Sequence, residues 1–284
     1  VQKDTFIGGA AIVAAHARGL GAQVQFFSVA GQDAPAEFAR SRLQEKGVRA
    51  HILEDGSRPT TLKQRFRARG KTLLRVSHLK QHDLNHDLQA AMIDQLTLAL
   101  SESNLVIFSD FNYGCLPQDV VDGVVNYCTK KNILMVADSQ SSSQVGDIAR
   151  FKGMGLITPT EREARLATRD FNSGLVVLAE KLRMQSRATN IILTLGSEGL
   201  LIHAGLNNAT KHPTDQLPAF NTAPKDSAGA GDSLLTCASM ALAVGCDIWQ
   251  SSYLGSLAAA CQVGRVGNIP LSPQDLDAEI EDSL

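Results

Sequence analysis

The stretch KDSAGAGDSLLT, residues 225–236, places three small residues in front of an aspartate and then continues into an apolar run. Gly229, Ala230 and Gly231 lack bulky side chains, so consecutive backbone N–H groups can converge on an anion. The apolar run 233–244 predicts a helix, whose N-terminal dipole would strengthen such a site. The stretch therefore predicts an anion hole at the mouth of a helix.

Asp232 stands in the first turn of this predicted helix, beside the anion hole. Two negative groups repel each other, so its carboxylate is not expected to bind the anion itself. It suits the acceptance of a proton from a hydroxyl that attacks a phosphoryl group, while the N–H groups neutralise charge on the transferring oxygens. An ordinary helix cap explains an aspartate at this position equally well.

Further apolar runs of strand length recur along the chain, and they are continuous rather than alternating. Helical stretches such as 117–130 and 173–185 separate them, which indicates a parallel sheet covered by helices on both faces. We therefore expect residues 1–284 to form a single doubly wound α/β domain. The runs are VQFFSVA from residue 24, NLVIFSD from 104, ILMVADS from 133, GLITPT from 155 and NIILTLG from 190.

Residues 48–79 break this rhythm, because they contain no long crossover helix and predict a small antiparallel β sheet. Basic residues recur at every second position, which in a strand places them on one face. Such a ladder either meets an anion or guards an exposed edge strand. Alternatively, ARGK at 68–71 is a turn that sends the last two elsewhere. The ladder consists of Lys63, Arg65, Arg67, Arg69 and Lys71.

The bulk composition is that of an ordinary globular protein, with 44% hydrophobic and 20% charged residues. A formal net charge of -2 provides no global basic field, so no nucleic-acid or membrane partner is expected. The chain shows no membrane-spanning run and no signal-peptide pattern, which predicts a cytoplasmic protein. Its five cysteines lack metal-binding spacing and are expected to be reduced core residues.

Four segments stand in the order FIGGAAIVAAHARGLGA, LITPTEREA, ILTLGSEGLLI and DSAGAGDS. They resemble, in the same order, the signatures G-G-A-x-N-x-A, P-N-x-x-E, T-x-G-x-x-G and D-T-x-G-A-G-D of the ribokinase-like (PfkB) sugar kinases, and the resemblance covers residues 6–270. Within that family, RPTTLKQRFRARGKTLLRVS and FSDFNYGCL look most like heptose 7-phosphate kinases, which read P-T-T-x-K-x-R and S-D-Y-x-K-G.

The resemblance implies a ribokinase-like fold with a β lid over the sugar and an ATP-dependent, Mg²⁺-assisted sugar or sugar-phosphate kinase. A heptose 7-phosphate is the best acceptor guess, and another hexose or phosphosugar is the alternative. The implied site comprises Asp232 as base with Gly229, Ala230 and Gly231 as anion hole; Thr194, Gly196, Gly199 and Asp226 for ATP; Glu163 for Mg²⁺; and Gly8, Gly9, Asp110, Lys63 and Arg65 for the sugar or its phosphate.

Several of these residues have ordinary structural alternatives. Without the family resemblance, a surface glutamate of a helix containing EREAR is the favoured interpretation of Glu163. For Asp110, a helix cap is the alternative. The glycines of the nucleotide loop also suit a plain hairpin between strands 190–195 and 199–203. A dinucleotide oxidoreductase and a P-loop enzyme are disfavoured, because the GxGxxG and Walker lysine patterns are absent.

The sequence departs from the family at several sugar-reading positions, which places substrate identity in doubt. Ile12 replaces an asparagine, Tyr113 and Gln140 replace lysines, and Thr160 replaces the asparagine of P-N-x-x-E. A catalytically silent sugar- or nucleotide-binding module, or the kinase half of a bifunctional nucleotide-sugar enzyme, is therefore the alternative function. We also expect the family's N-terminal strand to be absent from this sequence, and the lid to pair two subunits as a homodimer.

Overall fold

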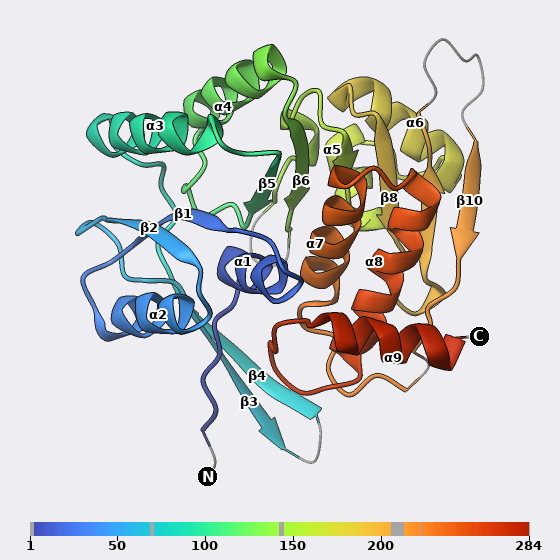
Figure 1. The fold of residues 1–284 in the computed structure, drawn as a ribbon, viewed down its shortest axis with the longest axis horizontal. Helices are drawn as coiled ribbons and strands as arrows, with labels where there is room; N and C mark the ends of the chain where they lie inside the picture. The colour runs from blue at the N-terminus through green and yellow to red at the C-terminus, as the bar shows by residue number, and fades with distance from the viewer. Residues whose placement is uncertain (1–2, 69–70, 142–144, 206–212, 222, 284) are drawn as a thin grey trace.

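The computed structural model describes residues 3–68, 71–141, 145–205, 213–221 and 223–283. Helices cover both faces of a largely parallel sheet, and a small antiparallel hairpin projects from one end (Figure 1). The strands are β1 (Gln25–Ala30), β2 (Arg49–Glu54), β3 (Leu62–Ala68), β4 (Lys71–His78), β5 (Leu105–Asp110), β6 (Leu134–Ser139), β7 (Leu156–Ile157), β8 (Asn190–Thr194), β9 (Leu200–His203) and β10 (Thr214–Leu217). The helices are α1 (Ala10–Gly19), α2 (Ala34–Glu45), α3 (His86–Leu100), α4 (Gln118–Lys131), α5 (Glu161–Thr168), α6 (Leu175–Ser186), α7 (Ala230–Ala243), α8 (Ile248–Val263) and α9 (Pro273–Ser283).

The larger sheet has the strand order β10-β9-β8-β7-β6-β5. Strands β5 to β8 are parallel to their neighbours, whereas β9 and β10 are antiparallel. Successive residues of β8 point to opposite faces: Ile191 and Leu193 pack toward α4 and α6, and Ile192 packs toward α7 and α8. Both faces are thus buried, which is why the strands read as continuous apolar runs and confirms the predicted doubly wound class.

A second sheet contains only β1 and β2, which are parallel to each other. Phe26 packs with α1 and α2 on one face, whereas Phe27 and Val29 pack with Met92 of α3 on the other. This small sheet is therefore also covered on both sides, as expected for part of a doubly wound domain.

The two sheets do not join within the described residues. There, β1 is paired only with β2, and β5 lies at the edge of the larger sheet beside β6. A cavity of about 2420 Å³ runs along the whole of β1 and β5 and continues to the carboxyl ends of β5 and β6. Apolar side chains such as Val13 of α1, Met92 of α3 and Val124 of α4 line it above and below the sheet plane. The cavity therefore has two parts. One part is an elongated gap between β1 and β5, and the other lies at the carboxyl ends of β5 and β6.

The lid comprises fewer residues than the insertion that was expected over residues 48–79. Its antiparallel hairpin consists of β3 and β4, whereas β2 belongs with β1. Ala68 of β3 pairs with Lys71 of β4, so Lys71 lies on the second strand of the hairpin, as the turn interpretation of ARGK predicted. Arg69 lies outside the described residues. An irregularity between Phe66 and Arg67 further shifts the ladder, so the basic residues do not form one regular face.

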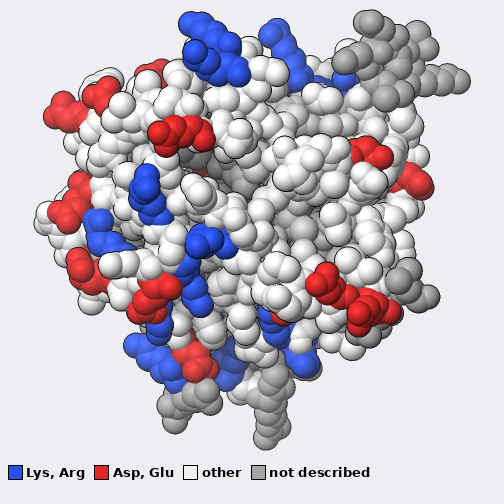
Figure 2. Space-filling model, viewed as in Figure 1, with Lys and Arg blue, Asp and Glu red and all other residues white. Residues whose placement is uncertain are grey.

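Of the five cysteines, Cys128, Cys237 and Cys261 are buried, as the sequence predicted, whereas Cys115 and Cys246 are half-buried. In the part of the chain that the structure describes, no helix is long and apolar enough to cross a membrane. Figure 2 shows acidic and basic side chains interspersed over one face, with Lys and Arg side chains near the end that carries the lid hairpin. This face has no extended field of one sign, in keeping with the small net charge.

Candidate active site

The helix mouth predicted from residues 225–236 is present. Gly229 precedes α7 with a φ of 83°, in the left-handed region that glycine adopts without strain. Ala230 and Gly231 begin the helix, and the first N–H groups of a helix have no carbonyl partner within it. A Cβ on Gly231 would meet nothing within 4 Å, and all three residues line the cavity. The backbone can therefore offer N–H groups to an anion in the cavity.

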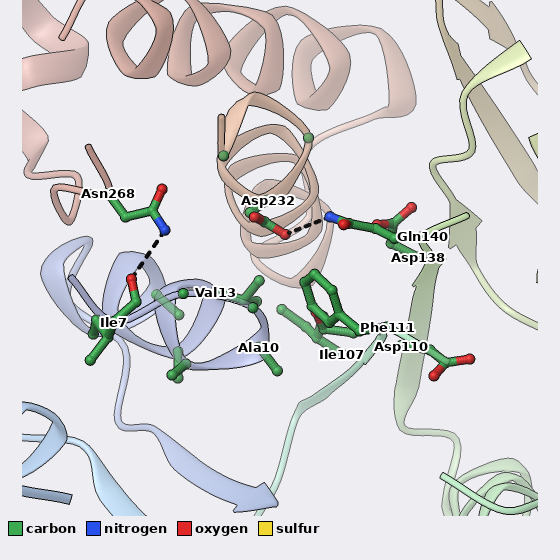
Figure 3. A pocket seen from close by; sticks show the side chains of 18 of the residues that line it. Ile7, Ala10, Val13, Ile107, Asp110, Phe111, Asp138, Gln140, Asp232 and Asn268 are labelled. Atoms are coloured by element: carbon green, nitrogen blue, oxygen red, sulfur yellow. Dashed lines mark hydrogen bonds between the residues drawn. The ribbon is translucent and has the colours of Figure 1, made fainter. Parts of the chain in front are cut away.

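Asp232 lies in the first turn of α7, with only 6% of its surface exposed. Its carboxylate faces the ends of β5 and β6 and accepts a hydrogen bond from Gln140 Nε2 at 3.4 Å (Figure 3). Burial raises the pKa of Asp232 to about 7, and the positive charge of Lys63 opposes this rise. A carboxylate with a pKa near neutrality is well matched to accepting a proton at physiological pH.

Lys63 projects from β3 over two aromatic rings beside Asp232. Its Nζ lies 5.2 Å from the ring centroid of Phe111 and 5.3 Å from that of Tyr113. The two rings are stacked with their centroids 6.4 Å apart. Phe111 also approaches Gly9, because a Cβ there would lie 3.4 Å from its ring. The rings therefore hold a lid cation close to the carboxylate and to the diglycine.

The diglycine Gly8–Gly9 lines the cavity at the start of α1. Gly9 has a φ of 59°, which favours glycine. Ile12, which stands where the family has a sugar-binding asparagine, is completely buried in the core between α1 and the β1–β2 sheet. The departure at Ile12 therefore has a packing explanation, since its side chain contributes to the core.

Asp110 ends β5 at the cavity, but its carboxylate is engaged on another side. Oδ2 accepts from Arg150 Nη2 at 2.9 Å and from Ser139 Oγ at 3.3 Å, and Oδ1 accepts from the backbone N–H of Asn112 at 2.9 Å. Figure 3 shows the side chain turned away from Asp232. Asp110 caps no helix, since the next helix, α4, begins after its N-cap Pro117, so the helix-cap alternative is wrong. A sugar contact by Asp110 stays a prediction.

Glu163 is buried, with 8% exposure, so the surface-glutamate alternative is wrong. Its Oε2 accepts hydrogen bonds from the backbone N–H and the hydroxyl of Thr160, each at 2.8 Å, and its Oε1 accepts from Ser141 N at 2.7 Å. Thr160 in turn caps the first turn of α5, which completes a capping box. The threonine that departs from the family signature thus retains a role as the helix cap.

Asp138, near the end of β6, is a cavity residue that sequence reasoning did not single out. It is 6% exposed. Burial, together with the negative charges of Glu163, Asp232 and Asp110, raises its pKa well above the usual range. The available signal was an acidic residue at the end of an apolar run, but the segment ADSQ was considered only for its missing lysine.

These mutually repelling carboxylates suit a divalent counter-charge. Mg²⁺ prefers oxygen ligands and retains several of its waters. Among the residues that the structure describes, no group of three or more His, Cys, Asp or Glu could hold a metal ion. Because the hydrogen bonds to Thr160 and Ser141 already occupy Glu163, contact through water fits these residues better than direct ligation.

The predicted nucleotide loop lies between β8 and β9 and lines the same cavity. Thr194 ends β8, and Gly196 has a φ of 64° with open space where a Cβ would stand. Gly199 has a φ of 92°, and a Cβ there would collide with the carbonyl oxygen of Leu217 in β10. The hairpin itself therefore requires Gly199, while Gly196 leaves room for a ligand.

Asp226, at the head of the anion-hole stretch, contacts the lid. Arg67 Nη1 donates to its Oδ2 at 3.1 Å, and Arg67 Nη2 donates to the carbonyl of Lys225 at 3.2 Å. The other oxygen of Asp226 accepts from the N–H of Ala228 at 3.2 Å. Arg65 is exposed on β3 and lines the cavity. The structure thus brings the predicted lid, anion hole, nucleotide loop and diglycine around one cavity.

The chain matches the model of the pfkB family carbohydrate kinases over residues 4–275. It is similar to the bifunctional protein HldE of Helicobacter hepaticus, with 30% identity over 274 residues that cover 94% of this chain and 54% of that protein. The bifunctional protein HldE of Geobacter sulfurreducens is 29% identical over 280 residues, covering 97% and 55%. The chain therefore spans about half the length of these curated relatives.

The fold is similar to that of phosphofructokinase-2 from Escherichia coli, with a TM-score of 0.78, 18% identity and coverage of 98% of this chain and 88% of that chain. Ribokinase from Thermotoga maritima gives a TM-score of 0.72 at 21% identity, covering 95% and 86%. These likenesses establish a ribokinase-like fold. Because the family model also spans nearly all of the sequence, the chain belongs to the pfkB family of carbohydrate kinases, which are ATP-dependent phosphotransferases.

Proposed function

We propose that this kinase phosphorylates a sugar phosphate of the heptose 7-phosphate type, with Asp232 as general base and the N–H groups of residues 229–231 as the anion hole. One observation carries the proposal: the buried carboxylate of Asp232 directly follows the helix-mouth amides and faces the cavity below Lys63.

The chemistry follows from this arrangement. Asp232 accepts the proton of the attacking hydroxyl, and the hydroxyl oxygen forms a bond to the γ-phosphorus of ATP. The bond between that phosphorus and the bridging oxygen breaks, so ADP leaves with the electron pair. The amides of residues 229–231 stabilise negative charge on the transferring oxygens, and the cavity under the lid limits the access of water.

The acceptor class is inferred from the lid. Lys63, Arg65 and Arg75 line the cavity from β3 and β4, where their charges could bind a second phosphate group on the acceptor. The resemblance of the lid sequence and of residues 108–116 to heptose 7-phosphate kinases supports this assignment. Tyr113 and Gln140, which replace lysines of that subfamily, would adjust the fit to the particular sugar.

Mg²⁺ is the proposed metal. Glu163 and Asp138 would face it, Glu163 through water, and the ion would supply positive charge for the phosphate oxygens of ATP. This role accords with the raised pKa of Asp138, since the buried carboxylates have an excess of negative charge around them.

A panel assay tests the function. Protein, ATP and Mg²⁺ are incubated with sugars and sugar phosphates, and ADP formation is measured for the parent, Asp232→Asn and the exposed control Asp94→Asn. We expect turnover with a sugar phosphate, unchanged in Asp94→Asn and lower by at least about 100-fold in Asp232→Asn. Sugar binding without ADP formation, or equal turnover in Asp232→Asn, would refute the proposal and favour a silent binding module.

We also propose that the gap between β1 and β5 receives an extended strand from chain outside residues 1–284. Within the described residues no other strand pairs with the facing edges of β1 and β5, and apolar side chains close the space above and below. A single strand satisfies both requirements, because it offers backbone partners on its two edges and side chains on its two faces. It would join the two sheets beside the active site.

A homodimer through the lid is the proposed assembly. The hairpin leaves Phe66, Leu73 and Leu74 between 51% and 71% exposed, and an isolated two-stranded hairpin is marginally stable in water. Sedimentation should show a dimer that Leu73→Lys dissociates; an unchanged sedimentation coefficient in that variant would contradict the lid contact.

We place the protein in the cytoplasm, where ATP is available and free thiols persist.

A further inference from the structure

Gln262, in the last turn of α8, is completely buried and contacts two loops of the active site. Its Nε2 donates to the carbonyl of Gly267 at 2.8 Å and to the carbonyl of Ala228 at 3.3 Å. Ala228 directly precedes Gly229, the residue that opens the anion hole. One side-chain amide therefore joins the anion-hole loop to the loop that follows α8.

The orientation of this amide follows from its partners. A carbonyl oxygen only accepts hydrogen bonds, so the donating nitrogen of Gln262 must face the two carbonyls. Its Oε1 is buried and has no hydrogen-bond partner among the described residues. Packing alone would favour an apolar side chain at such a position, because an unsatisfied buried oxygen is unfavourable. The amide is therefore best explained by the two loops that it connects.

The backbone of the same helix end anchors the start of the anion-hole loop. The N–H groups of Lys225 and Asp226 donate to the carbonyl of Val263 at 2.8 and 3.2 Å. Gln262 then holds the loop two residues later, at Ala228. Adjacent residues of α8 thus restrain both ends of the short segment that leads into the anion hole.

Asn268 extends this connection to the diglycine. Its Nδ2 donates to the carbonyl of Ile7 at 3.1 Å (Figure 3). Ile7 directly precedes Gly8. Its Oδ1 also borders the anion hole, since a Cβ on Gly229 would lie 3.0 Å from it. Farther along the same loop, the N–H of Leu271 donates to His16 Nδ1 of α1 at 3.0 Å. The loop after α8 is therefore attached both to α1 and to the anion hole.

We infer that Gln262 is a positioning residue for phosphoryl transfer: its amide, together with Asn268, sets the placement of the anion-hole N–H groups relative to the diglycine. The inference rests on the proposed roles of Asp232 and residues 229–231. Gln262 is completely buried and is not among the residues that line the cavity, so it acts through the loop. Displacements of about 1 Å in a reacting geometry can lower a rate by about 100-fold.

The test replaces Gln262 with methionine, which preserves length and apolar volume but removes the donor. For Gln262→Met we expect kcat to fall about 10- to 100-fold with KM for ATP changed less than about threefold, because the amides act mainly in the transition state. Gln274→Met, at an exposed position of α9, is the matched control and should leave both constants unchanged. Assays run well below each variant's Tm, so that loss of folded protein does not mimic the effect.

Asn268→Ala provides a second test at a half-buried position, should Gln262→Met fail to fold. A fall in kcat without a matching rise in the sugar KM supports the positioning role, whereas a rise in sugar KM alone overturns it. Equal kcat in Gln262→Met and the parent also overturns the inference. Asp232→Asn separates the two levels: if it is inactive while Gln262→Met is fully active, only the positioning inference fails.

Discussion

Arg67 and Asp226, 159 residues apart in the sequence, form an ion pair in which Arg67 Nη1 lies 3.1 Å from Asp226 Oδ2. Arg67 belongs to lid strand β3, and Asp226 begins the segment that leads into the anion hole. A second hydrogen bond, from Arg67 Nη2 to the carbonyl of Lys225 at 3.2 Å, strengthens the connection. Lid position and anion-hole position are therefore linked in this conformation.

Arg67→Ala should loosen the lid. The pair is partly exposed, so we expect a modest effect: kcat/KM for the acceptor falls about fivefold, and ATP hydrolysis without acceptor rises because water enters more easily. Lys130→Ala, which removes an exposed cation of α4 away from the lid and the cavity, serves as control. An unchanged ratio of hydrolysis to transfer in Arg67→Ala would contradict the link.

Lys63→Met should affect both binding and proton transfer. Loss of the cation is expected to raise KM for a sugar phosphate by at least about tenfold. The positive charge of Lys63 lowers the pKa of Asp232, so its removal should also move the acidic limb of the rate profile to higher pH. Lys46→Met, at the exposed C-cap of α2 and outside the cavity lining, is the control. An unchanged pH–rate profile in Lys63→Met would show that the charge of Lys63 does not influence the pKa of Asp232.

The reaction should depend on the ionisation of Asp232. Burial raises its pKa to about 7, and the surrounding groups include Lys63 of the lid, Asp138 of β6 and the neutral Gln140. Only the deprotonated carboxylate accepts a proton, so kcat/KM should rise about tenfold per pH unit below that pKa and level off above it. A profile that is flat between about pH 5.5 and 8 would refute the assignment of Asp232 as base.

Asp232→Asn should be inactive but more heat-stable at neutral and alkaline pH. The pKa of Asp232 rises from 3.8, its ordinary value, to about 7 in the folded protein, so the folded state binds the proton more tightly. The parent therefore loses stability as pH rises from about 4 to 7, with no further loss above. The Tm advantage of Asp232→Asn should be several degrees at about pH 8 and vanish near pH 4. An advantage independent of pH would contradict this account.

The gap between the sheets should be visible in hydrogen exchange. In the 284-residue chain, amides on the facing edges of β1 and β5 should exchange faster than those of the central strand β8. A longer chain that carries the proposed strand should show protection of these edges and a higher Tm. Strong protection of both edges in the 284-residue chain would show that they are already paired and would refute the proposed strand.

Much of the fold could be predicted from the sequence because it depends on local patterns. The continuous apolar runs indicated β5, β6, β7 and β8, whose two faces are both buried. The small residues 229–231 before an aspartate likewise indicated a helix mouth, since the absence of bulk and the start of an apolar helix are properties of neighbouring residues. The four signature-like segments and their order along the chain also indicated the family.

Burial and long-range contacts could not be predicted in the same way. The sequence alone did not show that Glu163 is buried. In the fold it is buried and accepts hydrogen bonds from Thr160 and Ser141. The raised pKa of Asp138 depends on its burial and on three other carboxylates, which belong to separate elements of the fold. The position of Lys71 on the second strand of the hairpin separated it from the rest of the predicted ladder.

The amino-acid sequence by itself therefore determined the order of the elements, the helix mouth and the identity of its carboxylate, because these follow from residues adjacent in the chain. Only the tertiary structure decided which distant groups meet that carboxylate, including Lys63 from the lid and Gln140 after β6. The physical reason is that packing sets both the dielectric surroundings and the distances between charges. Those two quantities in turn set the pKa of Asp232 and the electrostatic interactions around it.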